Sequence, residues 1–304
     1  MPPNRANVDT EKRNPRTRAL HTRSAADLVE IISNEDRDVV AALKRAGVRL
    51  TKFIEAAEPG FLAGGRLMYI GAGTSGRLGV LDASEAPPTF QVPPGRVVGI
   101  IAGGDAALRL SSEGAEDDEH GAVPALEALA LTSNDSVIGI AAGGTTAYVL
   151  GALAWCKADA RRDGQRPLTA LITCTAMDKP NAVDHLLTIR TGPEVVTGST
   201  RMKAGSATKM ALNIISTTLM IRAGKVYDNL MVDVRATNTK LRDRAGRIVE
   251  QLTALPRTDA FALLDRCDGE VKVAVVTHRL GVEPARAREV LAGAGGRLDR
   301  AMEG

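Results

Sequence analysis

The sequence predicts an α/β fold: a doubly wound parallel five-stranded sheet, preceded by helices and followed by a small helical bundle. Five short apolar runs have the length of buried strands, and four of them are rich in valine or isoleucine. Their apolar residues are continuous rather than alternating, which is typical of parallel strands covered by helices on both faces. Helical spacing between runs, as in residues 145–163, completes the alternation that predicts a doubly wound sheet. The five runs are residues 66–73, 96–104, 136–144, 167–175 and 185–192.

The segments on either side of the sheet are predicted to be helical. Residues 1–24 carry six Lys or Arg against two acids, and we expect a solvated or subunit-crossing tail there rather than a nucleic-acid or membrane anchor. Apolar residues at helical spacing from Ser24 onward predict two helices with a break at residues 34–36. A long helix is expected over residues 199–223, followed by three short helices at the C-terminal end. The expected domains are residues 1–50, 51–224 and 225–304.

Composition limits the possible functions. The chain has 304 residues with 39 Lys and Arg against 36 Asp and Glu, and this net charge of +3 is too balanced for a dedicated nucleic-acid protein. Aromatic residues make up 3%, which leaves little for stacking on bases. Three cysteines and four histidines are scattered without zinc spacing, so we expect no metal. Neither a signal peptide nor a membrane-spanning run is recognisable, so we expect a cytoplasmic protein that does not enter a membrane.

The first strand leads into a glycine-rich loop, residues 71–76, with the sequence Gly-Ala-Gly-Thr-Ser-Gly. This loop matches the dinucleotide-binding pattern, but the acid expected about 20 residues further on is missing, because Asp105 comes too late. Backbone N–H groups near Gly73 and the hydroxyls of Thr74 and Ser75, at a helix start, suit a compact anion such as a phosphate monoester. We favour a phosphate or phosphosugar loop, with a purely structural turn and a dinucleotide site as alternatives.

Two further clusters of hydroxyl residues follow later strands. Gly144, Thr145 and Thr146 come after the third strand, and loops from two neighbouring strands would converge on one edge of the sheet and hold one phosphosugar. The alternative is that one of the threonines only caps the next helix. Residues 193–209 combine hydroxyls with basic side chains near a helix start, and their alternative is a solvent-exposed helix face. The ligand candidates in this last cluster are Ser199, Thr200 and Lys203.

Two glutamates follow the carboxyl ends of the first two strands. Glu85 lies just before Pro87 and Pro88, which we expect to end the helix after the first loop, and Glu116 lies within a run of acids. A pair of carboxylates can divide the roles of general acid and base when their environments separate their pKa values. A run of acids is more often a solvated face, and the residues alone leave both interpretations open.

Four long motifs occur in a fixed order along the chain. They are residues 68–90 (MYIGAGTSGRLGVLDASEAPPTF), 113–117 (EGAED), 192–209 (GPEVVTGSTRMKAGSATK) and 229–245 (NLMVDVRATNTKLRDRA). Together with DTEKRNP (9–15) and SNED (33–36), they make the chain resemble the N-acetylmuramic acid 6-phosphate etherase family. The resemblance covers nearly the whole chain. It implies a sugar isomerase (SIS) domain, which is a three-layer αβα fold that binds phosphosugars, followed by a small helical region.

The resemblance implies a lyase that needs no cofactor and cleaves the D-lactyl ether of N-acetylmuramic acid 6-phosphate, giving N-acetylglucosamine 6-phosphate and D-lactate. In the open-chain sugar, the C1 aldehyde acidifies the C2 proton. A base removes that proton, an acid protonates the departing lactyl oxygen on C3, and water then adds to the unsaturated aldehyde. By this resemblance Glu85 is the acid and Glu116 is the base. A homodimer is also implied, since SIS domains usually pair.

One loop departs from the pattern of the family. Where the family usually has Ala-Ser-Gly-Arg-Thr-Pro, residues 142–147 of this chain are Ala-Gly-Gly-Thr-Thr-Ala. The serine hydroxyl and the arginine are therefore absent, whereas Thr146 remains and Thr145 adds a hydroxyl. Lys240 is a further site candidate, with a surface lysine as its alternative. Two other functions stay open from the residues: an aldose–ketose isomerase of a phosphosugar, and a non-catalytic phosphosugar sensor.

Overall fold

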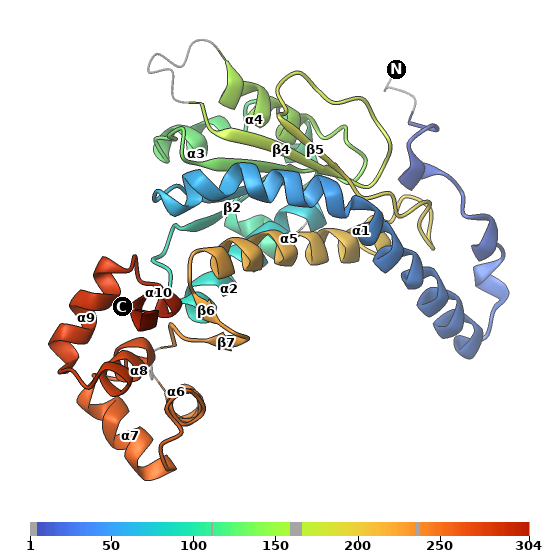
Figure 1. Ribbon diagram of the computed structural model, residues 1–304. Coiled ribbons are helices and arrows are strands. Elements are labelled where there is room, and N and C mark those ends of the chain that lie inside the picture. The colour runs from blue at the N-terminus through green and yellow to red at the C-terminus, as the bar shows by residue number, and fades with distance from the viewer. Residues whose placement is uncertain (1–4, 111, 159–165, 235–237, 304) are drawn as a thin grey trace. The chain divides into compact units, whose positions relative to one another are not determined.

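The computed structural model describes residues 5–110, 112–158, 166–234 and 238–303 (Figure 1). The chain forms two compact units. The first unit runs from the N-terminal segment through Ser84 and continues in Pro94–Ser216, and it contains the large sheet. The second unit consists of Glu85–Pro93 and the chain from Thr217 onward. The three domains expected from the sequence stay a prediction.

The first unit is built on a parallel five-stranded sheet, which confirms the predicted fold class. The strand order is β2-β1-β3-β4-β5, so the chain leaves β1 on one side to form β2 and returns to form β3 on the other. Gly71 pairs with Ile101 of β2 and with Ile140 of β3, which brings the carboxyl ends of these strands level. The strands are β1 (Leu67–Gly71), β2 (Val97–Ile101), β3 (Ser136–Ile140), β4 (Leu168–Thr173) and β5 (His185–Thr188).

Helices cover both faces of the sheet, which explains why the strands are apolar throughout. They are α1 (Ala25–Leu62), α2 (Gly73–Phe90), α3 (Val123–Ala128), α4 (Ala147–Lys157) and α5 (Lys203–Arg222). Figure 1 shows α3 and α4 on one side of the sheet and α1 and α5 on the other. On the α4 side, Met68 and Val137 of the strands pack with Leu153 in one buried cluster. Strand side chains therefore meet apolar partners whichever way they point.

A buried aspartate joins α2 to the sheet and to α5. Tyr69 of β1 donates a hydrogen bond of 2.8 Å to Asp82 Oδ2, and Asn213 and Ser216 donate bonds of 3.0 and 3.2 Å to Oδ1. Burial raises the pKa of Asp82 in spite of these bonds, and it raises the pKa of Tyr69 well above its ordinary value. The three donors fix the rotation of the helix that carries both the first glycine-rich loop and Glu85.

Helix α1 is continuous, so the predicted break at residues 34–36 is wrong. Ser24 caps the helix in a capping box with Asp27, and the helix then runs for 38 residues. Its buried residues recur at helical spacing from Val39 to Phe61. The polar stretch does not interrupt the helix, because Glu35 is buried there against cationic partners from distant segments.

Helix α2 also continues where a helix end was predicted, through Pro87 and Pro88 to Phe90. Prolines lack the N–H group, so the helix loses two backbone hydrogen bonds at this point. The bond from Gln91 N–H to the Pro87 carbonyl, at 2.9 Å, shows that the pattern resumes beyond them. Burial of Ala86 and Phe90 holds this turn in place. Glu85 therefore lies within a helix rather than at its exit.

The second unit has a helical core of its own. Its elements are the hairpin of β6 (Val226–Tyr227) and β7 (Leu230–Met231), then α6 (Thr239–Thr253), α7 (Arg257–Arg266), α8 (Val271–Leu280), α9 (Pro284–Gly293) and α10 (Leu298–Glu303). Residues 271–277 of α8 are buried without interruption, and the other helices pack around them. After α6, the described residues form four helices, α7 to α10, where the sequence predicted three, because Gly295 and Gly296 adopt positive φ values of 65° and 73° and separate α10 from α9. The hairpin was not predicted.

A buried ion pair holds the starts of β1 and β3 together. Asp135, 1% exposed, accepts bonds of 2.7 Å from the backbone N–H groups of Arg66 and Thr132 and from Arg66 Nη2. Burial alone would raise the pKa of Asp135, but these bonds outweigh it and lower that pKa.

Replacing Asp135 with asparagine should therefore destabilise the sheet. Asn keeps the shape but removes the charge that compensates the Arg66 guanidinium, so we expect the free energy of unfolding to fall by about 2–3 kcal/mol. Urea denaturation at pH 7 measures this difference. The control is Glu289→Gln, which breaks the exposed pair with Arg286 and should change stability by no more than about 0.5 kcal/mol. Equal effects of the two substitutions would contradict the argument.

Candidate active site

The first glycine-rich loop turns directly from β1 into α2, and a side chain would not fit at Gly71 or Gly76. A Cβ atom on Gly71 would lie 2.6 Å from the backbone nitrogen of Gly76, and one on Gly76 would lie 2.7 Å from the carbonyl oxygen of Gly71. Gly73, with a φ of +52°, begins the helix. Thr74 and Ser75 therefore stand in the first turn of α2, where backbone N–H groups lack helical partners and attract anions.

The second loop lies at the point where the strand order reverses. β1 and β3 pair in register, and their carboxyl ends lead toward α2 and α4. Ligands of open α/β sheets bind at such a switch point. Gly144, with a φ of +74°, is enclosed, since a Cβ atom there would lie 2.4 Å from Met177 Sδ. Thr146 occupies the N-cap position of α4 but makes no capping hydrogen bond, and Thr145 beside it is exposed.

Glu116 reaches the first loop from the adjacent strand. It is half-buried and lies on the 3₁₀ helix η5 (Glu113–Asp117), which follows β2. A Cβ atom on Gly73 would lie 3.1 Å from Glu116 Oε1, so the carboxylate borders the start of α2. The positive end of a helix dipole favours a carboxylate at this position. The structure thus brings together two residues that the sequence singled out in separate motifs.

Glu85 is an exposed residue of α2, one helical turn beyond the buried Asp82. Its carboxylate belongs to the second compact unit, whereas Glu116 belongs to the first. The pairing of these two glutamates stays a prediction.

The third cluster meets the first loop at Gly205 of α5. A Cβ atom on Gly205 would lie 3.3 Å from the carbonyl oxygen of Thr200 and 3.5 Å from the methyl carbon of Thr74. Ser199 and Thr200 form the half-buried turn before α5, and the Ser199 N–H bonds the Val196 carbonyl at 2.9 Å. The hydroxyl residues of two predicted clusters are therefore neighbours at one edge of the sheet.

Lys203 is fully buried, and its side chain contacts α1. Its Nζ lies 2.7 Å from Glu35 Oε2 and 3.6 Å from Asp38. The backbone N–H groups of Lys203 and Ala204 each donate a 2.9 Å bond to the Glu194 carboxylate, which occupies the start of α5. Burial raises the pKa of Glu194 against these donors. The contact of Lys203 with a substrate stays a prediction, and the geometry gives its ammonium group a positioning role.

Comparisons with known proteins identify the family. A family model described as the glucokinase regulatory protein N-terminal SIS domain matches residues 49–157. An N-acetylmuramic acid 6-phosphate etherase of Gloeobacter violaceus is 48% identical over 302 residues, covering 99% of this chain and 97% of that protein. Another, of Rubrobacter xylanophilus, is 49% identical over 285 residues, covering 93% and 92%. The chain belongs to the N-acetylmuramic acid 6-phosphate etherase family. Among solved structures, a phosphoheptose isomerase of Neisseria gonorrhoeae covers 63% of this chain and 98% of its own, at 18% identity and a TM-score of 0.42.

The N-terminal arm, residues 9–17, carries the DTEKRNP pattern of the etherase family and docks on its own chain. The Asp9 N–H donates a 2.9 Å bond to Thr175 Oγ1, just beyond β4. In the segment after β5, the Gly198 N–H donates a 3.1 Å bond to the Thr10 carbonyl. The expectation of a solvated tail is therefore wrong for these residues, and the subunit-crossing alternative stays a prediction. They include the 3₁₀ helices η1 (Asp9–Glu11) and η2 (Pro15–Thr17).

The arm also completes the ion cluster around Glu35, which lies in the SNED pattern of the etherase family. Asn14 Nδ2 and Arg16 Nη2 donate bonds of 2.7 and 2.8 Å to Glu35 Oε2, the oxygen that Lys203 also contacts. Burial raises the pKa of Glu35, but the hydrogen bonds from Arg16, Lys203 and Asn14 outweigh it and lower the pKa to about 2. The carboxylate therefore stays charged and links the arm, α1 and the start of α5.

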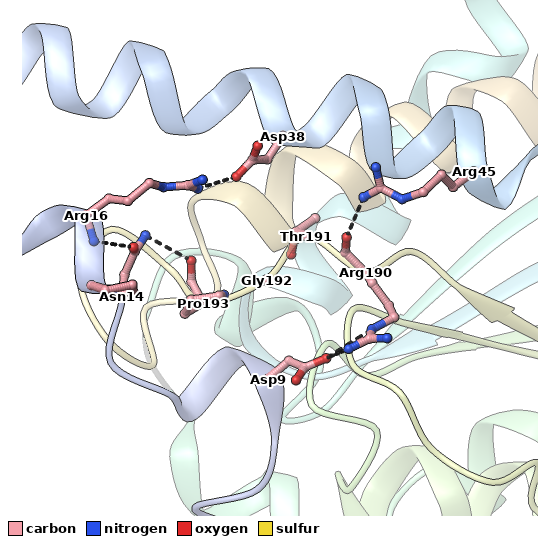
Figure 2. A pocket seen from close by; sticks show the side chains of 10 residues that line it. Asp9, Asn14, Arg16, Asp38, Arg45, Arg190, Thr191, Gly192 and Pro193 are labelled. Atoms are coloured by element: carbon pink, nitrogen blue, oxygen red, sulfur yellow. Dashed lines mark hydrogen bonds and ion pairs between the residues drawn. The ribbon is translucent and has the colours of Figure 1, made fainter.

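A pocket of about 510 Å³ lies between the arm, α1 and the segment after β5 (Figure 2). Arg190 donates a 3.0 Å bond to Asp9, and Arg45 donates a 3.2 Å bond to the Arg190 carbonyl. Arg16 pairs with Asp38 as well as with Glu35. Two of the three guanidinium groups are thus neutralised by carboxylates, so the pocket offers an anion little net positive charge.

Sequence reasoning missed several of these residues. Asn14 and Glu35 stand in the two N-terminal patterns shared with the etherase family, which carried the resemblance but suggested no role, and Arg16 directly follows the first pattern. Glu194 precedes its helix by too many residues for the usual cap spacing, so no local signal marks it. Each of these side chains acts through a partner far away in the sequence.

Among the described residues, no helix is both long enough and apolar enough to cross a membrane. The described part of the chain also contains no cluster of three or more His, Cys, Asp or Glu side chains arranged to hold a metal ion. Cys156, Cys174 and Cys267 are buried and form no disulfide. Burial raises the pKa of Cys174 to about 12, so this thiol is not a nucleophile at neutral pH.

Proposed function

We propose that this protein cleaves the D-lactyl ether of N-acetylmuramic acid 6-phosphate, the substrate after which its relatives are named. The proposed products are N-acetylglucosamine 6-phosphate and D-lactate. Similarity along nearly the whole chain supports the assignment. The observation that carries the chemistry is the position of the Glu116 carboxylate, which borders Gly73 at the edge where the two glycine-rich loops emerge.

In the proposed reaction, Glu116 removes the C2 proton of the open-chain sugar, whose C1 aldehyde stabilises the resulting carbanion. The C3–oxygen bond then breaks, and Glu85 protonates the departing lactyl oxygen. A double bond forms between C2 and C3. Water adds at C3 while a proton returns to C2, with Glu116 assisting, so the net reaction is hydrolysis of the ether. General acid–base groups of this kind contribute about 10²–10⁴-fold each.

The proposed phosphate site lies between the two glycine-rich loops. Gly73, Thr74 and Ser75 supply backbone N–H groups and hydroxyls at the start of α2. At the start of α4, backbone N–H groups and hydroxyls are supplied by Gly144, Thr145 and Thr146. The Thr146 hydroxyl is available because it does not cap the helix. Ser199 and Thr200 add hydroxyls beside Thr74.

The proposal is tested by incubating the purified protein with N-acetylmuramic acid 6-phosphate. We expect one D-lactate for each N-acetylglucosamine 6-phosphate, measured with a coupled D-lactate dehydrogenase assay. In ¹⁸O-labelled water, the new hydroxyl on C3 should carry the label. A ketose phosphate as product would instead identify an aldose–ketose isomerase, and absence of lactate at every pH between 5 and 9 would contradict the proposed function.

We also propose a cytoplasmic homodimer that binds no nucleic acid. Leu81 of α2 and Met210 and Ile214 of α5 are large apolar side chains exposed by 47%, 37% and 40% on neighbouring helices of the first unit. A second copy of the chain would cover such a patch. Cysteines that form no disulfide suit a reducing compartment. The net charge of +3 gives no strong attraction to nucleic acid.

A further inference from the structure

The carboxylate of Glu194 joins the two ends of one loop. Its Oε2 accepts a 2.9 Å bond from the backbone N–H of Lys203, nine positions later, and its Oε1 accepts a 2.9 Å bond from the N–H of Ala204. Both N–H groups belong to the first turn of α5, where they have no partner within the helix. Residues 195–202 therefore leave this carboxylate and return to it, and we call them the Glu194 loop.

The Glu194 loop carries two hydroxyls of the proposed phosphate site. Ser199 and Thr200 are half-buried, and their side chains make no hydrogen bond with other described residues. Their backbone is held, since the Thr200 N–H bonds the Gly198 carbonyl at 3.0 Å. The turn lies beside Thr74 of the first glycine-rich loop, with Gly205 between them. The hydroxyls are thus available to a ligand while their backbone is fixed.

A buried carboxyl group is an expensive way to hold a loop. Glu194 is 0% exposed, and burial raises its pKa in spite of the two backbone bonds. Helices are ordinarily capped by a short polar side chain directly before the first turn. Natural proteins keep such costly groups mainly at functional sites. The carboxyl group also occupies N–H groups of α5 that could otherwise bind a phosphate, which leaves the starts of α2 and α4 for the substrate.

The N-terminal arm holds the same loop at two further points. Thr17, itself buried, donates a 2.8 Å bond from Oγ1 to the Val195 carbonyl, and the Thr10 carbonyl accepts a 3.1 Å bond from the Gly198 N–H. Like the bonds to Glu194, both involve backbone groups of the loop or of its end. What these contacts fix is therefore the path of the backbone that carries the two hydroxyls.

We propose that Glu194 is a positioning residue, whose carboxylate holds the Glu194 loop so that the hydroxyls of Ser199 and Thr200 reach the phosphate of the substrate. The proposal rests on the proposed function and deepens it, because it names the group that places two of the phosphate ligands. Glu194 acts through the loop and does not touch the substrate, since it is fully buried.

The first test uses Glu194→Gln, which keeps the size of the side chain but offers an amide N–H₂ where one backbone N–H needs an acceptor. We expect KM for N-acetylmuramic acid 6-phosphate to rise about tenfold while kcat changes less than about twofold. The Kd for inorganic phosphate, measured by calorimetry on the full chain, should rise by the same factor. A fall in kcat at unchanged KM would overturn the proposal.

A double-mutant cycle separates positioning from general damage. In the background Ser199→Ala/Thr200→Val, adding Glu194→Gln should change the phosphate Kd by less than about twofold, because Glu194 acts only through the hydroxyls that are already gone. Thr17→Val, which leaves the start of α5 intact, should raise the Kd about threefold in the wild type and not in this background. A further tenfold loss on adding Glu194→Gln, or an unchanged Kd in both Glu194→Gln and Thr17→Val, would overturn the proposal.

The matched control is Asp135→Asn, which removes an equally buried carboxylate at the opposite ends of the strands. It should lower stability, as argued above, and leave the phosphate Kd within about twofold of the wild type. An equal rise in Kd would show that lost stability alone weakens binding and would overturn the proposal. If phosphate binding follows the expected pattern but no lactate is released, the proposed function fails while the role of Glu194 stands.

Discussion

Glu116→Gln should release D-lactate at least about 10³-fold more slowly than the wild type while keeping its fold. Glutamine has the size of glutamate and cannot accept the C2 proton, so the first step of the proposed reaction is lost. In deuterated water the variant should also fail to exchange that proton, which NMR measures on the recovered substrate. Exchange at the wild-type rate would contradict the role of Glu116 as the base.

Two variants separate this prediction from general damage. Glu119→Gln changes an exposed acid in the same run of carboxylates and should retain wild-type activity. Glu85→Gln should lose lactate release but keep exchange at C2, because removal of the C2 proton precedes the step that Glu85 assists. If both glutamate variants lost exchange of the C2 proton equally, the assignment of Glu85 as the acid and Glu116 as the base would be wrong.

Glu35→Gln should lower the free energy of unfolding by about 3–5 kcal/mol, since it removes the nearest carboxylate from the fully buried Lys203 ammonium. Asp38 lies 3.6 Å from that ammonium and is 40% exposed, so it compensates only in part. Chemical denaturation at pH 7 measures the loss. The matched control is Asp265→Asn, which breaks the exposed pair with Arg242 and should cost no more than about 1 kcal/mol.

The pH dependence of the stability difference between the wild type and Glu35→Gln provides an independent check. The pKa of Glu35 is lowered from 4.5 to about 2, so its contribution is fully present above pH 4.5 and disappears as the pH falls toward 2. The stability gap between wild type and Glu35→Gln should stay constant from pH 7 to 5 and narrow below 4.5. The double variant Glu35→Leu/Lys203→Met, which removes both charges, should regain most of the lost stability. A double variant as unstable as Glu35→Gln would show that the buried charge is not the cause.

The sheet could be predicted from the sequence because its signals are local. Runs such as SVIGI (136–140) contain the information needed to specify a buried strand, and Gly71 and Gly76 mark the turn that follows β1. The boundaries of the helices were harder to predict from the sequence. At residues 34–36 the polar stretch indicates a break only as long as the partners of Glu35 are unknown, and one of them, Lys203, lies 168 residues away. Pro87 and Pro88 remove hydrogen bonds, but the buried Ala86 and Phe90 keep the helix intact.

The residues of the candidate site also differ in whether a local sequence signal predicts them. Thr74, Ser75 and Thr146 follow strands at glycine-rich turns, so their clustering follows from the topology of a parallel sheet. The burial of Lys203 depends on an arm whose docking leaves no periodic pattern in the sequence. A motif therefore locates such residues without saying whether each one contacts the ligand or supports a residue that does.

The docked arm has a consequence for the order in which the protein is made. Asp9 is translated before its partners Thr175 and Arg190, which follow 166 and 181 positions later. At ribosomal rates of about 5–20 residues per second, roughly 10–40 s pass before these partners emerge. During this interval Glu35 has no Lys203, so water must solvate its charge and α1 cannot complete its burial. On a nascent chain the arm can therefore dock only after β4 and β5 have been translated, whereas refolding from denaturant offers both segments at once.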